Sequence, residues 1–109
     1  DILLEGVTLS RLNQIFQDVM KKQYEKLDPV RSKFGKIEKE EVTVDDKMDY
    51  LNEYILTHKK FKFRDLLQNQ KSKLHVIVTF LAILEMMKMG TVRVEQENTF
   101  DDIIITSMV

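Results

Sequence analysis

The stretch that decides the fold is KLHVIVTFLAILEMMKMG, residues 73–90. Twelve of the sixteen residues from 74 to 89 are apolar, which predicts one long helix with apolar side chains around most of its circumference. Gly90 marks the expected end of this helix, because glycine readily adopts the left-handed conformation that follows many helices. The run is too short, and too often interrupted by polar residues, to span a bilayer.

A β-hairpin is expected directly after this helix. TVRVEQ (91–96) alternates apolar and polar residues, and FDDIIIT (100–106) reads as a second strand, with a turn between them. Alternation along the second strand places Ile103 and Ile105 on one face and Ile104 on the other.

A second helix is predicted from residue 45 to residue 59. Thr43 is a good N-cap, and Asp46 three residues later completes a weak capping box. Four of its side chains are expected to face inward: Met48, Leu51, Tyr54 and Ile55.

Three short segments join the two helices. KFKF (60–63) alternates and suits a half-buried strand with Phe61 and Phe63 on its core face. Residues 64–67 are predicted as a short helix, and residues 68–72 as a polar turn. The order of elements predicts a mainly α fold with a small β-hairpin, namely a winged helix-turn-helix domain.

The segment before residue 43 is expected to form a helical arm. Residues 8–27 carry apolar side chains at helical spacing, and Asp28-Pro29 ends the helix, since the residue before a proline is pushed out of the helical region. We place the arm and a charged linker in residues 1–35 and the winged helix in residues 36–109. Three placements of the arm remain open: free, folded back on the winged helix, or paired with a copy of itself.

The length, net charge and cysteine content exclude several classes of protein. The chain has 109 residues and a net charge of −1, which gives no general attraction to nucleic acid or to an anionic membrane. It has no cysteine, which excludes disulfides and fits a reducing compartment, so we expect a cytoplasmic protein. Because the chain begins with Asp1, we also expect it to be a fragment of a longer protein.

No motif for catalysis, a metal or a cofactor is visible. His58 and His75 are isolated in the sequence and lack partners at metal-ligand spacing, and there is no glycine-rich phosphate loop. Asp101 and Asp102 are neighbours that would point to opposite faces of a strand, so a solvated turn explains them better than a shared reacting atom. We therefore predict no enzyme activity and no cofactor.

Two features are weighed as nucleic-acid surfaces. HKKFKFR (58–64) interleaves basic and aromatic residues, but an amphipathic edge strand guarded by lysines explains it better. The long helix offers Lys71 and Lys73 in its first turn, yet it lacks arginine and a polar face for reading bases. The acidic hairpin tip would also repel a phosphate backbone. A DNA-binding winged-helix regulator is therefore the alternative to a protein-binding role.

Residues 78–106, VTFLAILEMMKMGTVRVEQENTFDDIIIT, resemble the C-terminal winged-helix domain of a bacterial kleisin family, segregation and condensation protein A. The most specific part is the turn with Gln96, Glu97, Phe100, Asp102 and Ile103. The segments EEVTVDDKMDYL and FKFRDLL also fit the family. The resemblance is strong from residue 36 to residue 106 and weaker over residues 1–35, where the family varies more.

The resemblance implies a structural subunit of a chromosome-organising complex. Family members bridge the two ATPase heads of an SMC dimer, and their C-terminal domain docks on one SMC head. Their middle region binds segregation and condensation protein B, and residues 1–35 fit the end of that region. Their N-terminal domain matches no part of this chain. The resemblance thus implies an association with the nucleoid through the SMC complex. The charge and composition, by contrast, predict no direct sequence-specific contact with nucleic acid and no contact with a membrane.

The apolar excess of the long helix supplies a candidate docking surface, because one side could be buried by another protein or by the rest of the chain. We expect Phe80 and Leu84 to form an apolar ridge, with Ile77 and Leu81 in the ridge or in the core. An unused apolar face would also permit self-association of the chain. The full set of expected SMC-head contacts is Ile77, Phe80, Leu81, Leu84, Val94, Gln96, Glu97, Phe100, Asp102 and Ile104.

Overall fold

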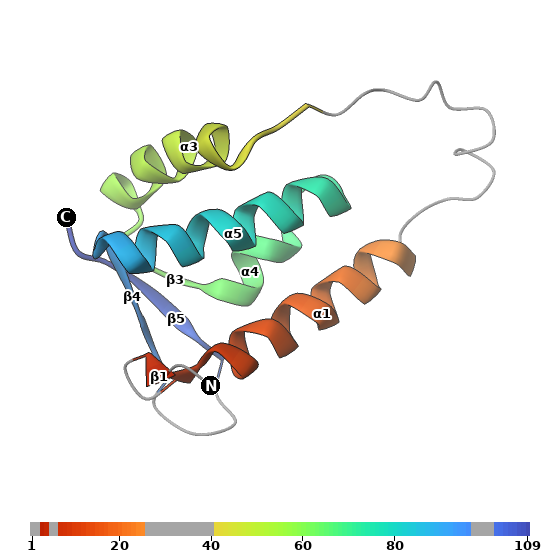
Figure 1. Cartoon of the computed structure of the whole chain (residues 1–109), viewed down its shortest axis with the longest axis horizontal. Coiled ribbons are helices and arrows are strands. Elements are labelled where there is room, and N and C mark those ends of the chain that lie inside the picture. Colours follow the sequence, from red (N-terminus) through yellow and green to blue (C-terminus); the bar gives the residue numbers. More distant parts are fainter. Residues whose placement is uncertain (1–2, 5–6, 26–40, 97–101) are drawn as a thin grey trace.

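The computed structural model describes residues 3–4, 7–25, 41–96 and 102–109. Figure 1 shows α5 at the centre of the molecule, with α3 along one side and α1 along the other. The elements, in order, are β1 (Leu3–Leu4), β2 (Val7–Thr8), α1 (Leu9–Glu25), α3 (Val44–Thr57), β3 (Lys60–Lys62), α4 (Phe63–Gln68), α5 (Lys73–Met89), β4 (Val92–Glu95) and β5 (Ile104–Ser107).

The segment from α3 to β5 has the winged-helix arrangement predicted from the sequence. β4 and β5 form the expected antiparallel hairpin, and β3 pairs with the other side of β5, so the sheet order is β3-β5-β4. Ile103 and Ile105 are fully buried and Ile104 is half-buried, which confirms the alternation read along this strand. The tip of the hairpin lies outside the described residues.

The strand at residues 60–63 ends one residue earlier than expected. Lys62 closes β3, and Phe63 is the first residue of α4, where its ring is fully buried. Phe61 on the strand itself is half-buried. The two rings therefore reach the core from different elements, and the prediction that they share one strand face was wrong.

The ends of both long helices are fixed by the residues that predicted them. The Thr43 hydroxyl accepts a hydrogen bond from the backbone N–H of Asp46, and the Asp46 carboxylate accepts one from the backbone N–H of Thr43, so the capping box is complete. Ser72 caps the start of α5. Gly90 ends it with a φ of 84°, a left-handed conformation that glycine adopts without strain.

The arm helix folds back on the winged helix. Leu12 and Ile15 of α1 are fully buried in the same hydrophobic core as α4 and α5. The ring of Phe16 stacks on that of Phe80, with centroids 4.6 Å apart. This answers the question of where the arm lies, whereas the boundary proposed near residue 35 falls outside the described residues and stays a prediction. The two-residue β1–β2 ladder before α1 was not predicted.

An ion-pair cluster also joins α1 to the winged helix. Arg64 of α4 pairs with Asp18 of α1 and donates a hydrogen bond from Nε to Oδ1 of Asp102, at 3.4 Å. Lys22 lies 3.4 Å from the same Asp18 carboxylate. The hydrogen bond from Arg64, and then the hydrogen bond and charge of Lys22, hold the pKa of Asp18 below its usual value despite some desolvation. Among the helices of the described residues, none combines the length and the apolar character that a membrane span requires.

Candidate functional site

The outward side of α5 carries a stripe of apolar residues. Ile77, Leu81 and Leu84 follow one another at helical spacing, and Leu81 is 45% exposed while the other two are half-buried. Leu84 also packs against the edge of the core. The structure therefore sets the phase of the helix, which its uniformly apolar sequence left open.

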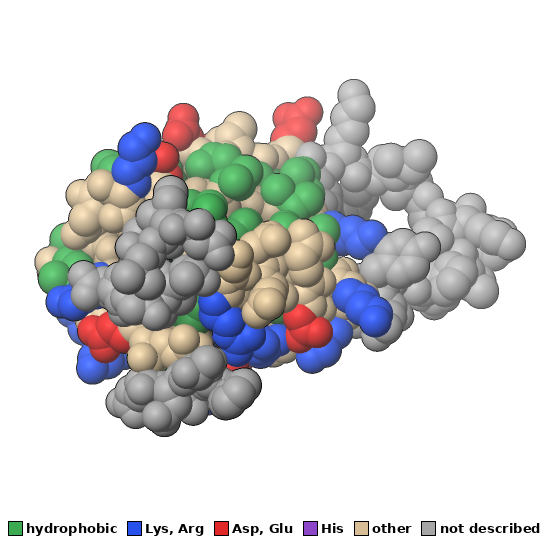
Figure 2. Space-filling model, turned by 60° about the horizontal axis from the view of Figure 1, so that its bottom comes forward, with side chains coloured by type: hydrophobic (Ala, Val, Ile, Leu, Met, Phe, Trp, Pro, Cys, Tyr) green, Lys and Arg blue, Asp and Glu red, His purple; other side chains and the backbone are tan. Residues whose placement is uncertain are grey.

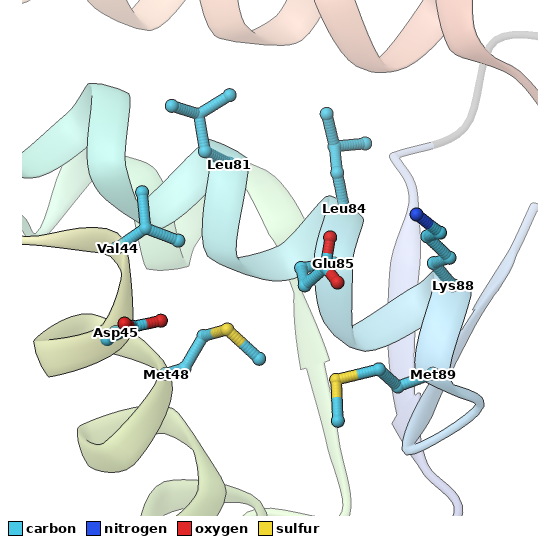
Figure 3. Close-up of a pocket in the computed structure, with 8 residues that line it drawn as sticks. All are labelled: Val44, Asp45, Met48, Leu81, Leu84, Glu85, Lys88 and Met89. Atoms are coloured by element: carbon cyan, nitrogen blue, oxygen red, sulfur yellow. The ribbon is translucent and has the colours of Figure 1, made fainter.

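An open groove of about 760 Å³ runs between this stripe and α3. Figure 3 shows Leu81 and Leu84 projecting from α5 to the same side, with Met48 on the neighbouring helix α3. Met89, at the end of α5, is 61% exposed. The complete lining is Val44, Asp45, Met48, Leu81, Leu84, Glu85, Lys88 and Met89.

The chemistry of the groove suits a protein partner. Its floor is leucine, valine and methionine, and methionine adapts to irregular apolar surfaces. Asp45, Glu85 and Lys88 provide charges of both signs beside this floor. Figure 2 shows one face of the molecule on which hydrophobic side chains gather in a patch at the surface, with acidic side chains at its border. An apolar centre with charged surroundings is the usual composition of a protein-docking surface.

Two of the residues expected at the interface belong to the core. Phe80 is only 8% exposed, because α1 covers it and Phe16 stacks on its ring. Val94 is buried as well, since β4 turns it toward the core. Phe80 therefore does not form an exposed ridge with Leu84, and of the expected residues on α5 it is Leu81 and Leu84 that line the groove beside α3.

The expected contacts on the hairpin are only partly visible. Gln96 and Ile104 are half-buried. Asp102 is half-buried, and its Oδ1 lies 3.4 Å from Nε of Arg64. An ion pair within the chain therefore offsets part of the charge of Asp102. Glu97 and Phe100 lie outside the described residues.

A polar pocket that the sequence did not predict lies where α3 faces the end of α4 and the start of α5. Lys47 is buried there, and its Nζ lies 2.9 Å from Oε1 of Gln70 and 3.1 Å from Nδ1 of His75. Desolvation, and then the nearby charge of Lys71, lower the pKa of Lys47. A signal was present in the sequence, since Lys47 precedes Leu51 by four residues and therefore shares its inward face.

The fold leaves little of α5 available for reading DNA. α5 packs against α3, α4, β4 and α1, so the helix that would enter a major groove is flanked by other elements. Past its first turn the exposed residues are Leu81, Glu85, Lys88 and Met89. Leu81 and Met89 carry no group for a base edge, and Glu85 and Lys88 border the apolar groove. No cluster of three metal-ligating side chains occurs within residues 3–4, 7–25, 41–96 and 102–109.

Comparison of the sequence with known proteins finds relatives of this chain in one family. Residues 6–108 match the family model described as segregation and condensation protein ScpA. Segregation and condensation protein A of Clostridium acetobutylicum is 32% identical over 94% of the chain, and that of Bacillus pumilus is 38% identical over 91%. The corresponding protein of Clostridium tetani is 33% identical over 99%. The chain spans about two fifths of the length of these relatives, with 41%, 38% and 42% covered in turn.

Proposed function

This chain belongs to the family of segregation and condensation protein A, and from that membership we propose that it serves chromosome segregation and condensation by docking on an SMC ATPase head. The match over residues 6–108 is the observation that carries this function. The proposed role is structural and requires no catalysis. It places the protein in the cytoplasm, associated with the nucleoid through its partner.

The docking surface that we propose is the groove between α3 and α5. Leu81 and Leu84 would insert into an apolar recess of the head, and Met48 and Met89 would adapt to its contour. Asp45 and Glu85 would meet basic side chains at the border, which would raise the rate of encounter more than the affinity. β4 lies at an edge of the sheet, a position from which strand addition could extend the contact.

A contact with segregation and condensation protein B is a separate proposal. The resemblance assigns it to the middle region of the family, and this chain carries at most the end of that region. We therefore expect the SMC head, rather than protein B, to bind the groove.

The decisive experiment is capture of this chain by a purified SMC head. Leu81→Glu should lower the affinity at least about tenfold, because it puts a charge at the centre of the apolar floor. Leu56→Glu is the matched control, since Leu56 is 58% exposed on α3 and does not line the groove. Both variants should keep the circular dichroism spectrum and melting temperature of the parent chain.

The outcomes separate three interpretations. Capture that survives Leu81→Glu at full affinity would exclude the groove as the docking site. Loss of capture in both variants would point to a general effect of added charge. Sedimentation of the chain alone tests whether a second copy occupies the groove, in which case Leu81→Glu would convert a dimer into a monomer.

A further inference from the structure

The pocket around Lys47 has an unusual charge pattern. It encloses about 430 Å³ and is lined by Lys47, Lys71 and His75 together with Tyr50, Asn69 and Gln70. Lys47 is 8% exposed, and within the described ranges 7–25, 41–96 and 102–109 it forms no ion pair with a carboxylate. A buried ammonium group without a counter-charge is unfavourable, so this residue needs an explanation beyond packing.

The contacts of Lys47 hold its ammonium group in position without neutralising it. Gln70 Oε1 is a neutral acceptor, and His75 Nδ1 accepts from Lys47 in the tautomer that leaves this nitrogen unprotonated. Gln70 is itself fixed, because its Nε2 donates to the backbone oxygen of Leu66 at 3.0 Å. Its backbone oxygen accepts from Nε2 of Gln23 at 2.7 Å. Through these contacts, helices α1, α4 and α5 together fix the position of Lys47 on α3.

Several positive or anion-binding groups border the same space. Lys71 is exposed, and its charge disfavours the protonated form of Lys47. Helix α5 begins beside the pocket, with Ser72 as its N-cap, and its dipole adds positive potential there. The ring of Tyr50 is 54% exposed, and its centroid lies 5.4 Å from Nζ of Lys47. Tyr54 stays protonated, since burial, and then the proximity of Tyr50 and Asp65, raise its pKa.

We propose that this pocket binds a small phosphate-bearing ligand, whose oxygens accept hydrogen bonds from Lys47 and whose charge is shared with Lys71. A phosphate group carries roughly 1.5 to 2 negative charges at neutral pH, which the ammonium groups of Lys47 and Lys71 can share. The recessed position of Lys47 favours a free phosphate or a nucleotide over the backbone of a duplex, because a duplex cannot follow the side chain into the pocket. This inference is independent of docking on an SMC head.

The experiment is a nuclear magnetic resonance titration of the ¹⁵N-labelled chain with inorganic phosphate and, separately, with ADP. Sodium chloride keeps the ionic strength constant, so that general screening does not mimic binding. We expect saturable shifts confined to residues 69–75 and Lys47, with a dissociation constant of about 1 mM or tighter for at least one ligand. Tighter binding of ADP would identify a nucleotide site that uses Tyr50, and equal binding would identify a site for phosphate itself.

Two substitutions in the pocket and one outside it test the assignment. Lys47→Met keeps the length and apolar stem of the side chain and should weaken binding at least about tenfold. Lys71→Met is the second variant, because Lys71 is exposed and its removal leaves the folded core unchanged; it should weaken binding about threefold or more. Lys88→Met, on the other end of α5, should bind as the parent chain does.

Three results would overturn the proposal: no saturable shift with either ligand, equal affinity in Lys71→Met and the parent chain, or shifts produced only by duplex DNA. The variant Leu81→Glu distinguishes a failure of this phosphate pocket from a failure of the docking groove of the proposed function. It should bind phosphate normally, so failure of the groove and failure of this pocket give different patterns.

Discussion

The two sides of α5 show how one apolar helix divides into a core and a surface. Phe80 and Leu81 are neighbours in the sequence and both are large and apolar, yet Phe80 is 8% exposed and Leu81 is 45% exposed. The difference comes from α1, which brings Phe16 onto the ring of Phe80, whereas Leu81 faces the open groove beside α3. The number of apolar residues on a helix therefore indicates how much of its surface is to be buried. The elements packed against the helix determine which side is buried within the chain.

The strongest test of this division compares truncations at the two neighbouring positions. Phe80→Ala should lower the free energy of unfolding by roughly 3 kcal/mol, because it leaves a cavity under α1 and removes the ring stack. Leu81→Ala should change it by no more than about 0.5 kcal/mol. Urea unfolding followed by circular dichroism measures both, and similar values would mean that the two sides of α5 are not distinguished by burial.

A smaller effect sharpens the description of the groove side. Thr43→Ala removes the side-chain half of the capping box of α3 and should lower the free energy of unfolding by about 1 kcal/mol. Because Val44 lines the groove as the first residue of α3, the variant should also speed hydrogen exchange in the first turn of this helix. Amide exchange in α1 should change only by the global loss of stability; a selective increase there would contradict the separation of the two sides.

The smallest effect concerns the ion pairs on the α1 side. The folded-state pKa of Asp18 lies below its usual value of 3.8, so its contribution to stability is present above that pH and is lost as the pH falls through the folded-state pKa. Asp18→Asn should therefore lower the free energy of unfolding by about 0.5 kcal/mol at neutral pH, a value limited by solvent screening of a carboxylate whose side chain is 45% exposed. The difference from the parent chain should shrink below pH 3.8, as measured from urea midpoints. A difference that persists there would mean that packing, not charge, is lost.

Most of the fold could be predicted from the sequence because short-range patterns, such as helix caps and strand alternation, agreed with one another. The Thr43–Asp46 capping box and Gly90 fixed the ends of two helices, and alternation in the hairpin placed Ile103 and Ile105 inward. These signals depend on residues close in sequence, where backbone geometry leaves few choices. The pairing of β3 with β5 was not predicted, because a three-residue strand carries too little pattern to name its partner.

For the candidate site, the sequence predicted the helix that carries it but not all of the residues that line it. An apolar excess on α5 predicted an interaction surface, but the spacing of Phe80 and Leu84 could not say which side α1 would cover, since α5 is apolar around most of its circumference. Lys47 was missed for the opposite reason. Charged residues are usually exposed, although the position of Lys47 one turn before Leu51 places it on the inward face of α3, where Gln70 and His75 accept hydrogen bonds from its ammonium group.

The position of β5 also bears on how the chain is made. β5 follows β3 and β4 in the sequence yet lies between them, so neither earlier strand has a partner until β5 has been synthesised. A nascent chain that has emerged only as far as β4 exposes the edges of β3 and β4 and the apolar side of α5 that packs against the sheet. Unpaired strand edges promote association between chains, so the sheet is completed only once β5 has been translated, and a chain truncated before β5 should aggregate.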